Sequence, residues 1–370
     1  MSTAKITSGK TKQRVVLPDY KREMIEAYDA DNSYPERVRD IVLASGVARA
    51  CTEIFERYIF GNGISDPALF KMVVDRKGTT LDKLLRKCVA DYALWYGYAI
   101  HVQYNAFGEK IGYTHLPFEY CRKGIKDKEG LIAVYDNWDR RDLNKPFRAN
   151  DIQYLHPYNP SAVISEIENC EGATIEEKMK NYKGQVLWFS KEGNEYPLAP
   201  CDPVLEDVQT TYQIKLFKNK NIRTNFMASH MFVHKGKFED ETERQDMMKS
   251  LERFQGAEMA GNIMMIEVDN VEQIPQLLPF TIQNNDKLWE YTESSTIQNI
   301  VQNYFIPPVL AGILQAGKLG TSNEINEAHD FYNAYTAFDR MSISEEFTRL
   351  LGQPVTIEAK SAIFQTPPTA

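Results

Sequence analysis

Apolar side chains recur at intervals of three and four residues in two early stretches of the chain, which is the spacing of an amphipathic helix. The first stretch covers residues 35–60, with a break predicted near Ser45-Gly46, and the second covers residues 80–96. Residues 61–63, Gly-Asn-Gly, follow the first stretch and accept the positive φ angles that end a helix. Residues 98–104 alternate between apolar and polar, which predicts a strand.

More short apolar runs follow a turn predicted at residues 105–108. The charged residues 160–183 are expected to be helical. The first half of the chain therefore predicts helices that lead into an antiparallel sheet, an α+β organisation. The further strands are predicted at residues 111–118, 131–135, 152–155 and 186–189.

The second half of the chain predicts long helices. Asp202 and Pro203 have the form of a helix start, with a capping carboxylate before a proline, and apolar positions continue to about Arg223. A second long helix is predicted at about residues 285–305, ended by Pro307-Pro308. Between the two helices the pattern predicts a small α/β unit. Its elements are a strand at 227–233, a helix at 239–254 and a strand at 263–268.

A third helix is predicted after a glycine-rich connector. Residues 321–324, Thr-Ser-Asn-Glu, form a capping box, in which Thr321 and Glu324 would satisfy backbone donors at the helix start. Residues 342–345, Ser-Ile-Ser-Glu, are a second candidate cap for a continuation to Leu351. Residues 355–359 are a candidate strand.

Composition narrows the function classes. The chain has a net charge of -8, which argues against a protein that grips nucleic acid along its whole surface. Its five cysteines are scattered without a CxxC pair, so the sequence predicts neither a zinc site nor a disulfide framework. It has no apolar run of about 18 residues and no signal-peptide pattern, so a spanning or secreted chain is not expected. Residues 1–24 are basic and are expected to form a flexible arm.

The connector Gly312-Ile-Leu-Gln-Ala-Gly-Lys-Leu-Gly-Thr-Ser322 approaches the phosphate-binding pattern GxxxxGK[ST]. Leu319 stands where that pattern needs Ser or Thr, and a helix with two prolines stands where it needs a strand. Ser8-Gly-Lys-Thr11 also matches only in part, because Ala4 replaces the first glycine. His230 and His234 lack the glutamate of HExxH. The sequence therefore predicts no catalytic residue, metal ligand or cofactor, although an enzyme with a site assembled from distant residues remains an alternative.

The connector is glycine-rich and almost uncharged, and its flanks carry a resemblance. The order Tyr304-Phe-Ile-Pro-Pro-Val-Leu-Ala-Gly312, glycine-rich loop, Thr-Ser-Asn-Glu324 and long helix resembles the region around the tunnel loop of portal proteins from tailed double-stranded DNA bacteriophages. Residues 46–63, 91–99, 116–122 and 186–205 resemble other segments of that family in the same order.

This resemblance implies a portal fold with a mixed α/β wing, two long stem helices, a small α/β clip inserted between them, and a tunnel loop followed by a long helix. A crown would be minimal or absent. The implied divisions are 1–24 basic arm, 25–201 wing, 202–224 first stem helix, 225–268 clip, 269–305 connection and second stem helix, 306–322 tunnel loop, 323–352 tunnel helix and wing, and 353–370 short strand and tail.

The resemblance also implies a non-enzymatic ring, usually of twelve copies, at the portal vertex of a virion assembled in a bacterial cytoplasm. Its implied partners are the terminase large subunit, major capsid and scaffold proteins, head-tail connector proteins and double-stranded DNA in the channel, with no membrane. Another ring-forming head or tail protein and a nucleotide-binding enzyme are the alternatives. The implied site residues are Gly312, Gln315, Gly317, Lys318 and Gly320 in the tunnel loop, Pro307, Pro308, Thr321 and Glu324 at its flanks, and Leu205, Val208, Ile297, Ile300 and Val301 in the stem.

Overall fold

The computed structural model describes residues 24–138, 149–193, 195–223, 230–235, 263–268, 286–312 and 322–362, together with Thr242 and Gln245. Its contacts divide the chain into two compact units. One contains residues 1–208 and 298–370, and the other contains Gln209–Ile297. The predicted basic arm and the predicted helix at 239–254 lie outside the described residues, apart from Met24 and two single positions in the helix.

The first unit begins with two helices that meet at the predicted break. Helix α1 (Tyr34–Ala44) and helix α2 (Gly46–Phe60) are separated by Ser45, whose side chain accepts a hydrogen bond from Ala48 N at 3.3 Å and so caps α2. Gly61 then adopts φ +58°, and a Cβ there would lie 1.8 Å from the Glu358 carbonyl oxygen. Only glycine fits this position, because the chain passes close to strand β10 (Ile357–Glu358).

Helix α4 (Leu81–Trp95) has the predicted buried face, which includes Leu84, Leu85 and Cys88. The short helix α3 (Pro67–Phe70) precedes it. Strand β1 (Gly63–Ile64) pairs with β10, which joins residues nearly 300 positions apart in the chain. The strand predicted at 355–359 is confirmed, although it is shorter, and it pairs antiparallel with β1.

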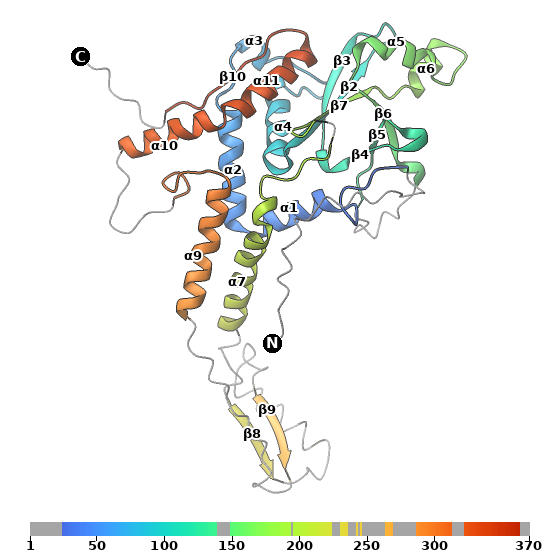
Figure 1. The fold of residues 1–370 in the computed structure, drawn as a ribbon. Helices are drawn as coiled ribbons and strands as arrows, with labels where there is room; N and C mark the ends of the chain where they lie inside the picture. Colours follow the sequence, from blue (N-terminus) through green and yellow to red (C-terminus); the bar gives the residue numbers. More distant parts are fainter. Residues whose placement is uncertain are drawn as a thin grey trace, which may run out of the picture. The chain divides into compact units, whose positions relative to one another are not determined.

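The main sheet of this unit has six strands in the order β3-β2-β7-β6-β5-β4 (Figure 1). It was predicted to be antiparallel, but β6 and β7 run parallel. Parallel neighbours need a crossover, and helices α5 (Val163–Glu168) and α6 (Ile175–Asn181) lie in the segment that joins these two strands. The strands are β2 (Gly97–Tyr104), β3 (Lys110–Leu116), β4 (Cys121–Lys123), β5 (Ile132–Val134), β6 (Gln153–Pro157) and β7 (Gln185–Ser190).

Two predicted caps are wrong. A 3-10 turn (Asp202–Val204) leads directly into helix α7 (Leu205–Arg223), so the helical segment begins where it was predicted. The Asp202 carboxylate, however, accepts a hydrogen bond of 2.7 Å from the Tyr34 hydroxyl and does not cap the helix. Ser342 is not a cap either. Helix α10 (Ser322–Tyr335) ends near Thr336, and helix α11 (Ala337–Leu351) runs through Ser342 without a break.

Helix α9 (Asp286–Asn303) confirms the second long helix, although it ends before the two prolines. Helices α7 and α9 each cross the division between the units. The second unit also contains strands β8 (His230–Lys235) and β9 (Ile263–Val268), which pair in parallel. No helix in the described ranges is both long and apolar enough to cross a membrane.

Candidate channel segment and assembly surfaces

The segment that precedes the predicted tunnel loop begins with a tight helix ending. Phe305 adopts φ +53°, its amide donates to Gln302 O at 2.9 Å, and the amide of Ile306 donates to Val301 O at 3.2 Å. These two bonds form a Schellman motif, in which glycine usually occupies the left-handed position. Because this motif closes α9 at Tyr304, the helix ends before Pro307 can interrupt it.

Pro307 and Pro308 do not interrupt a helix, because they lie in a turn that follows the end of α9. The amide of Leu310 donates to Pro307 O at 2.9 Å, and Gly312 follows with φ +72°. No atom lies within 4 Å of the position that a Gly312 Cβ would take. Of the predicted loop residues, Gly312 is therefore described and exposed, whereas Gln315, Gly317, Lys318, Gly320 and Thr321 lie outside the described residues.

Two buried tyrosines hold the flanks of this segment together. The Tyr332 hydroxyl on α10 donates to Tyr304 O at 3.1 Å, and the Tyr304 hydroxyl lies 2.9 Å from Thr52 Oγ1 on α2. The ring of Tyr332 meets Tyr58 edge-on, with ring centroids 4.8 Å apart. Burial raises the pKa of Tyr332 well above its ordinary value, so the hydroxyl keeps its proton and remains a donor. Both ends of the loop are thus fixed to α2.

Glu324 is exposed on the first turn of α10. Its predicted partner in a capping box, Thr321, lies outside the described residues, so the capping box stays a prediction.

The predicted stem residues have different environments. Val208, Ile300 and Val301 are buried in the main core of the first unit, whereas Leu205 and Ile297 are half-buried. In the first unit, Asn299 Nδ2 lies 3.3 Å from Asp207 Oδ2. In the second unit, Lys218 forms an ion pair with Glu293. Within each unit, therefore, a polar contact joins α7 to α9.

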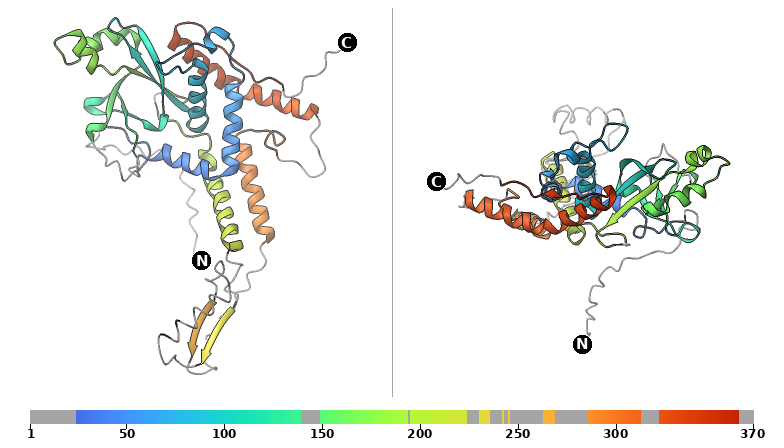
Figure 2. Two further views of the ribbon diagram at one scale, coloured as in Figure 1. Left: turned by 180° about the vertical axis from the view of Figure 1, so that it is seen from behind. Right: turned by 90° about the horizontal axis from the view of Figure 1, so that it is seen from above.

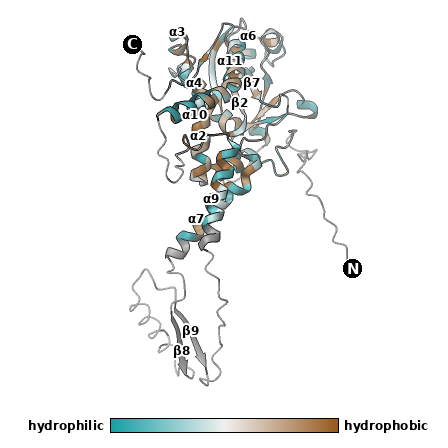
Figure 3. Ribbon diagram, turned by 60° about the vertical axis from the view of Figure 1, so that its left-hand side comes forward, coloured by the Kyte–Doolittle hydropathy of each residue, from teal (hydrophilic) through white to brown (hydrophobic). Residues whose placement is uncertain are grey.

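Helix α7 has a second apolar face within the second unit. Thr211 and Ile214 are buried, but Tyr212 and Leu216 are 38% and 43% exposed. Because Tyr212 and Leu216 are four residues apart, they lie on one face, roughly opposite Ile214. Figure 3 shows hydrophilic and hydrophobic stretches along α7. A helix with apolar side chains on two faces has a surface for a second packing partner.

Helices α10 and α11 expose a group of large apolar side chains on the first unit. Phe305 stacks on Tyr335 with ring centroids 5.0 Å apart, and both rings are exposed. The spacing of apolar residues does not show that these side chains face away from the core. The exposed stripe consists of Phe305, Phe331, Tyr335, Phe338 and Met341.

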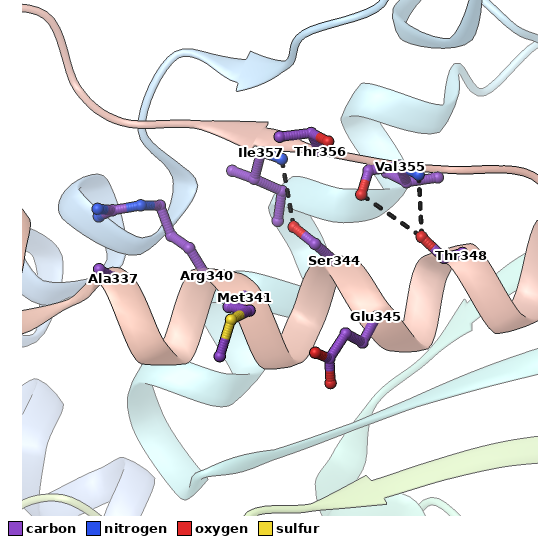
Figure 4. A pocket seen from close by; sticks show the side chains of 9 residues that line it. All are labelled: Ala337, Arg340, Met341, Ser344, Glu345, Thr348, Val355, Thr356 and Ile357. Carbon is purple, nitrogen blue, oxygen red and sulfur yellow. Dashed lines mark hydrogen bonds between the residues drawn. The ribbon is translucent and has the colours of Figure 1, made fainter.

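A groove of about 450 Å³ lies beside this stripe, between α11 and the segment 355–357 (Figure 4). Three of its polar side chains already have backbone partners. Ser344 Oγ accepts from Ile357 N at 3.2 Å, Thr348 Oγ1 accepts from Val355 N at 2.9 Å, and Arg340 donates to Tyr58 O at 2.7 Å. The first two bonds attach the segment 355–357 to α11, and the third attaches α11 to α2, so these side chains serve the packing of the fold.

The buried thiols and the one His–Asp contact described next have roles in packing and not in an evident reactive site. Burial raises the pKa of Cys51 and of Cys201 to about 12, so both thiols stay protonated at neutral pH. His115 Nε2 lies 2.9 Å from Asp91 Oδ2, but the same oxygen accepts from Phe118 N and so fixes the turn after β3. In the ranges that the structure describes, no three potential metal ligands come together.

Comparison with solved structures identifies the fold. One similar chain comes from the virion of a native gene transfer agent particle, with a TM-score of 0.53 and 12% identity over 88% of this chain and 83% of that chain. Another comes from the neck of an empty gene transfer agent particle computed with C6 symmetry, with a TM-score of 0.52 and 12% identity over 89% and 84%. A third comes from the neck of a native particle computed with C12 symmetry, with a TM-score of 0.51 and 12% identity over 90% and 85%.

No protein-family model and no curated protein matches this chain. At 12% identity the structural likeness concerns the fold and not the activity. It extends over both the helical second half and the mixed first half, and it agrees with the α+β class predicted from the sequence. The chain therefore has an α+β fold of the kind present in these particle chains.

Proposed function

We propose that this chain is the portal subunit of a phage-like particle, and that copies of it form a ring-shaped channel for DNA packaging and ejection. The observation that carries the proposal is the likeness, over about nine-tenths of the chain, to a chain in a particle neck computed with C12 symmetry. In this proposal the wing covers 25–201, the stem helices lie in 202–224 and 269–305, and the clip covers 225–268. The tunnel loop, 306–322, carries Lys318 toward the DNA, and the chain itself performs no catalysis.

Two features of the described residues support a ring. Helix α7 carries Tyr212 and Leu216 on a second apolar face, which suits a rod packed between neighbouring rods. The flanks of the proposed tunnel loop are fixed by Tyr304 and Tyr332, which suits a loop that must stay in place while DNA passes. The terminase, the capsid and scaffold proteins and the head-tail connector are the proposed partners at the two ends of the ring.

Negative-stain electron microscopy with mass photometry tests the ring. We expect annular particles with an axial hole and a mass near twelve subunits of 42.5 kDa each. A monomer or dimer at every concentration, also in the presence of the capsid protein of the same particle, would overturn the proposal. Rings that bind no terminase would favour another ring-forming head or tail protein.

A further inference from the structure

The stripe on α10 and α11 is larger than scattered surface apolar residues. Phe305, Phe331, Phe338 and Met341 are each more than half exposed. With about 200 Å² for a large side chain, the stripe exposes roughly 500 Å² of apolar surface. That is at the upper end of the patches found on monomeric proteins and suits the centre of an interface that buries about 800 Å² per partner. A protein surface is therefore a better match than a small ligand.

The backbone conformation of Phe305 also supports a role for the stripe in binding another protein. A left-handed φ of +53° favours glycine, yet an aromatic residue occupies the position and points a half-exposed ring at Tyr335. Phe305 therefore has a less favourable backbone conformation than glycine would have, and its ring lies at the surface. Helices α10 and α11 run end to end along one side of the first unit (Figure 2).

The stripe has an acidic border. Helix α10 carries Glu324, Glu327 and Asp330, all exposed, and contains no lysine or arginine. Glu327, Phe331 and Tyr335 follow one another at intervals of four, so acidic and aromatic groups share one face. A surface of this composition attracts lysine and arginine both by charge and by cation–π contact.

The same unit has a basic surface on another side. Lys83, Arg86 and Lys87 are exposed on α4, and Lys71, Arg76 and Lys77 are exposed in the segment before it. On α4, Tyr92 lies on the face opposite Lys83, Arg86 and Lys87. The Tyr92 hydroxyl donates to Asp339 on α11 at 2.6 Å, so α11 packs against the face of α4 that is opposite its basic residues. The basic surface and the acidic stripe therefore point in different directions. Val73, 59% exposed, adds an apolar contact beside the basic residues.

We propose that the aromatic-acidic stripe of α10–α11 docks on the basic surface around α4 of a second copy of this chain. The contact joins two different surfaces, so each copy keeps one surface open for the next neighbour, and repetition closes a ring. This inference rests on the proposed ring and names the surfaces that would build it.

Charge reversal tests the pairing. One variant carries Glu327→Lys and Asp330→Lys, and the other carries Lys83→Glu and Lys87→Glu. All four side chains are exposed and, among the described residues, form no ion pair. We expect each variant alone to need at least about tenfold more protein for half-maximal ring formation, because every contact then opposes like charges. An equimolar mixture should restore rings to within about threefold, because alternating copies again pair opposite charges.

Glu168→Lys with Glu171→Lys is the control for the first variant, since it makes the same change in net charge at exposed positions at and just after the end of α5. It should form rings like the unmodified chain. Circular dichroism shows whether the variants fold, and the neutral pair Glu327→Gln and Asp330→Asn replaces the reversal if they do not. Rings that form equally well from all variants, or a mixture that stays unassembled, would overturn the pairing and leave the ring proposal standing. An unmodified chain that forms no ring would overturn both.

Discussion

At the scale of single residues, the sequence predicted a candidate channel segment but not the contacts that hold its flanks. No pattern in the sequence indicated that Tyr304 and Tyr332 contact each other. The structure shows them as a hydrogen-bonded pair that connects α9, α10 and α2. Such a pair cannot be recognised from spacing, because its members lie 28 positions apart in the chain and meet only after the helices pack.

The Tyr332 hydroxyl gives the first prediction. Tyr332→Phe removes the donor to the Tyr304 carbonyl and leaves that buried oxygen without this bond. We expect the free energy of unfolding to fall by about 1 to 2 kcal/mol. Urea unfolding followed by circular dichroism measures the change. Tyr335→Phe makes the same chemical change on a half-exposed ring of the same helix and should have an effect below about 0.5 kcal/mol. An equal fall in the free energy of unfolding in the two variants would contradict a stabilising role for the Tyr332 hydrogen bond.

Glu56 gives a prediction that depends on pH. Burial, and then the nearby Glu53, raise the pKa of the Glu56 carboxyl, so folding disfavours its charged form. Its stabilising contribution is therefore full at low pH and is lost as pH rises through the folded pKa. Glu56→Gln has no such loss, so the variant should gain stability relative to the unmodified chain between about pH 4 and pH 7. Melting temperatures across this range measure the difference, with exposed Glu129→Gln as control. A difference that does not change with pH would contradict it.

At the scale of elements, most helices and strands could be predicted because their apolar periodicity matches the surface that each buries. The break at Ser45 and the face of α4 are examples. One failure occurs where a distant residue competes for a local signal. Asp202 accepts a hydrogen bond from Tyr34 and does not cap. Ser342, the other predicted cap, lies inside α11, which begins at Ala337. The parallel pairing of β6 with β7 was also missed, because periodicity does not specify strand direction.

The second apolar face of α7 gives a prediction at this scale. Leu216→Ser removes an exposed apolar side chain, so a single copy should fold normally. In a ring the same side chain would be buried, and its loss should weaken each contact between copies by roughly 1 to 2 kcal/mol. Mass photometry across concentrations should show fewer rings, whereas Lys215→Ser, a change at the adjacent exposed residue, should leave them unchanged. Rings of unaltered stability would indicate that this face stays in solvent.

At the scale of the whole molecule, the net charge of -8 hides an uneven distribution. One surface of the first unit is acidic and aromatic, and another is basic. Total charge correctly argued against a chain that is basic throughout, but it could not reveal two complementary surfaces, because their charges cancel in the sum.

This distribution predicts a salt dependence of assembly. Raising the salt from about 0.05 M to about 0.5 M shortens the screening length to less than half and should weaken ring formation. The Glu327→Gln and Asp330→Asn variant should respond less to salt, because fewer charges meet at its contact. Sedimentation velocity at several salt concentrations measures both slopes. A steeper response in the neutral variant than in the unmodified chain would be inconsistent with charge pairing at this contact.

The pairing of β1 with β10 has a consequence for the order of synthesis. Gly63 lies opposite Glu358, and Tyr58 contacts His329, so the early helices meet their partners only after nearly 300 further residues have left the ribosome. The nascent chain therefore carries an incomplete core for most of its translation time, a state in which chaperones bind. Because α10 and α11 follow the second unit in the chain, the aromatic stripe is completed only after that unit has been synthesised. If copies pair through this stripe, they can do so only after the second unit of each copy has been synthesised.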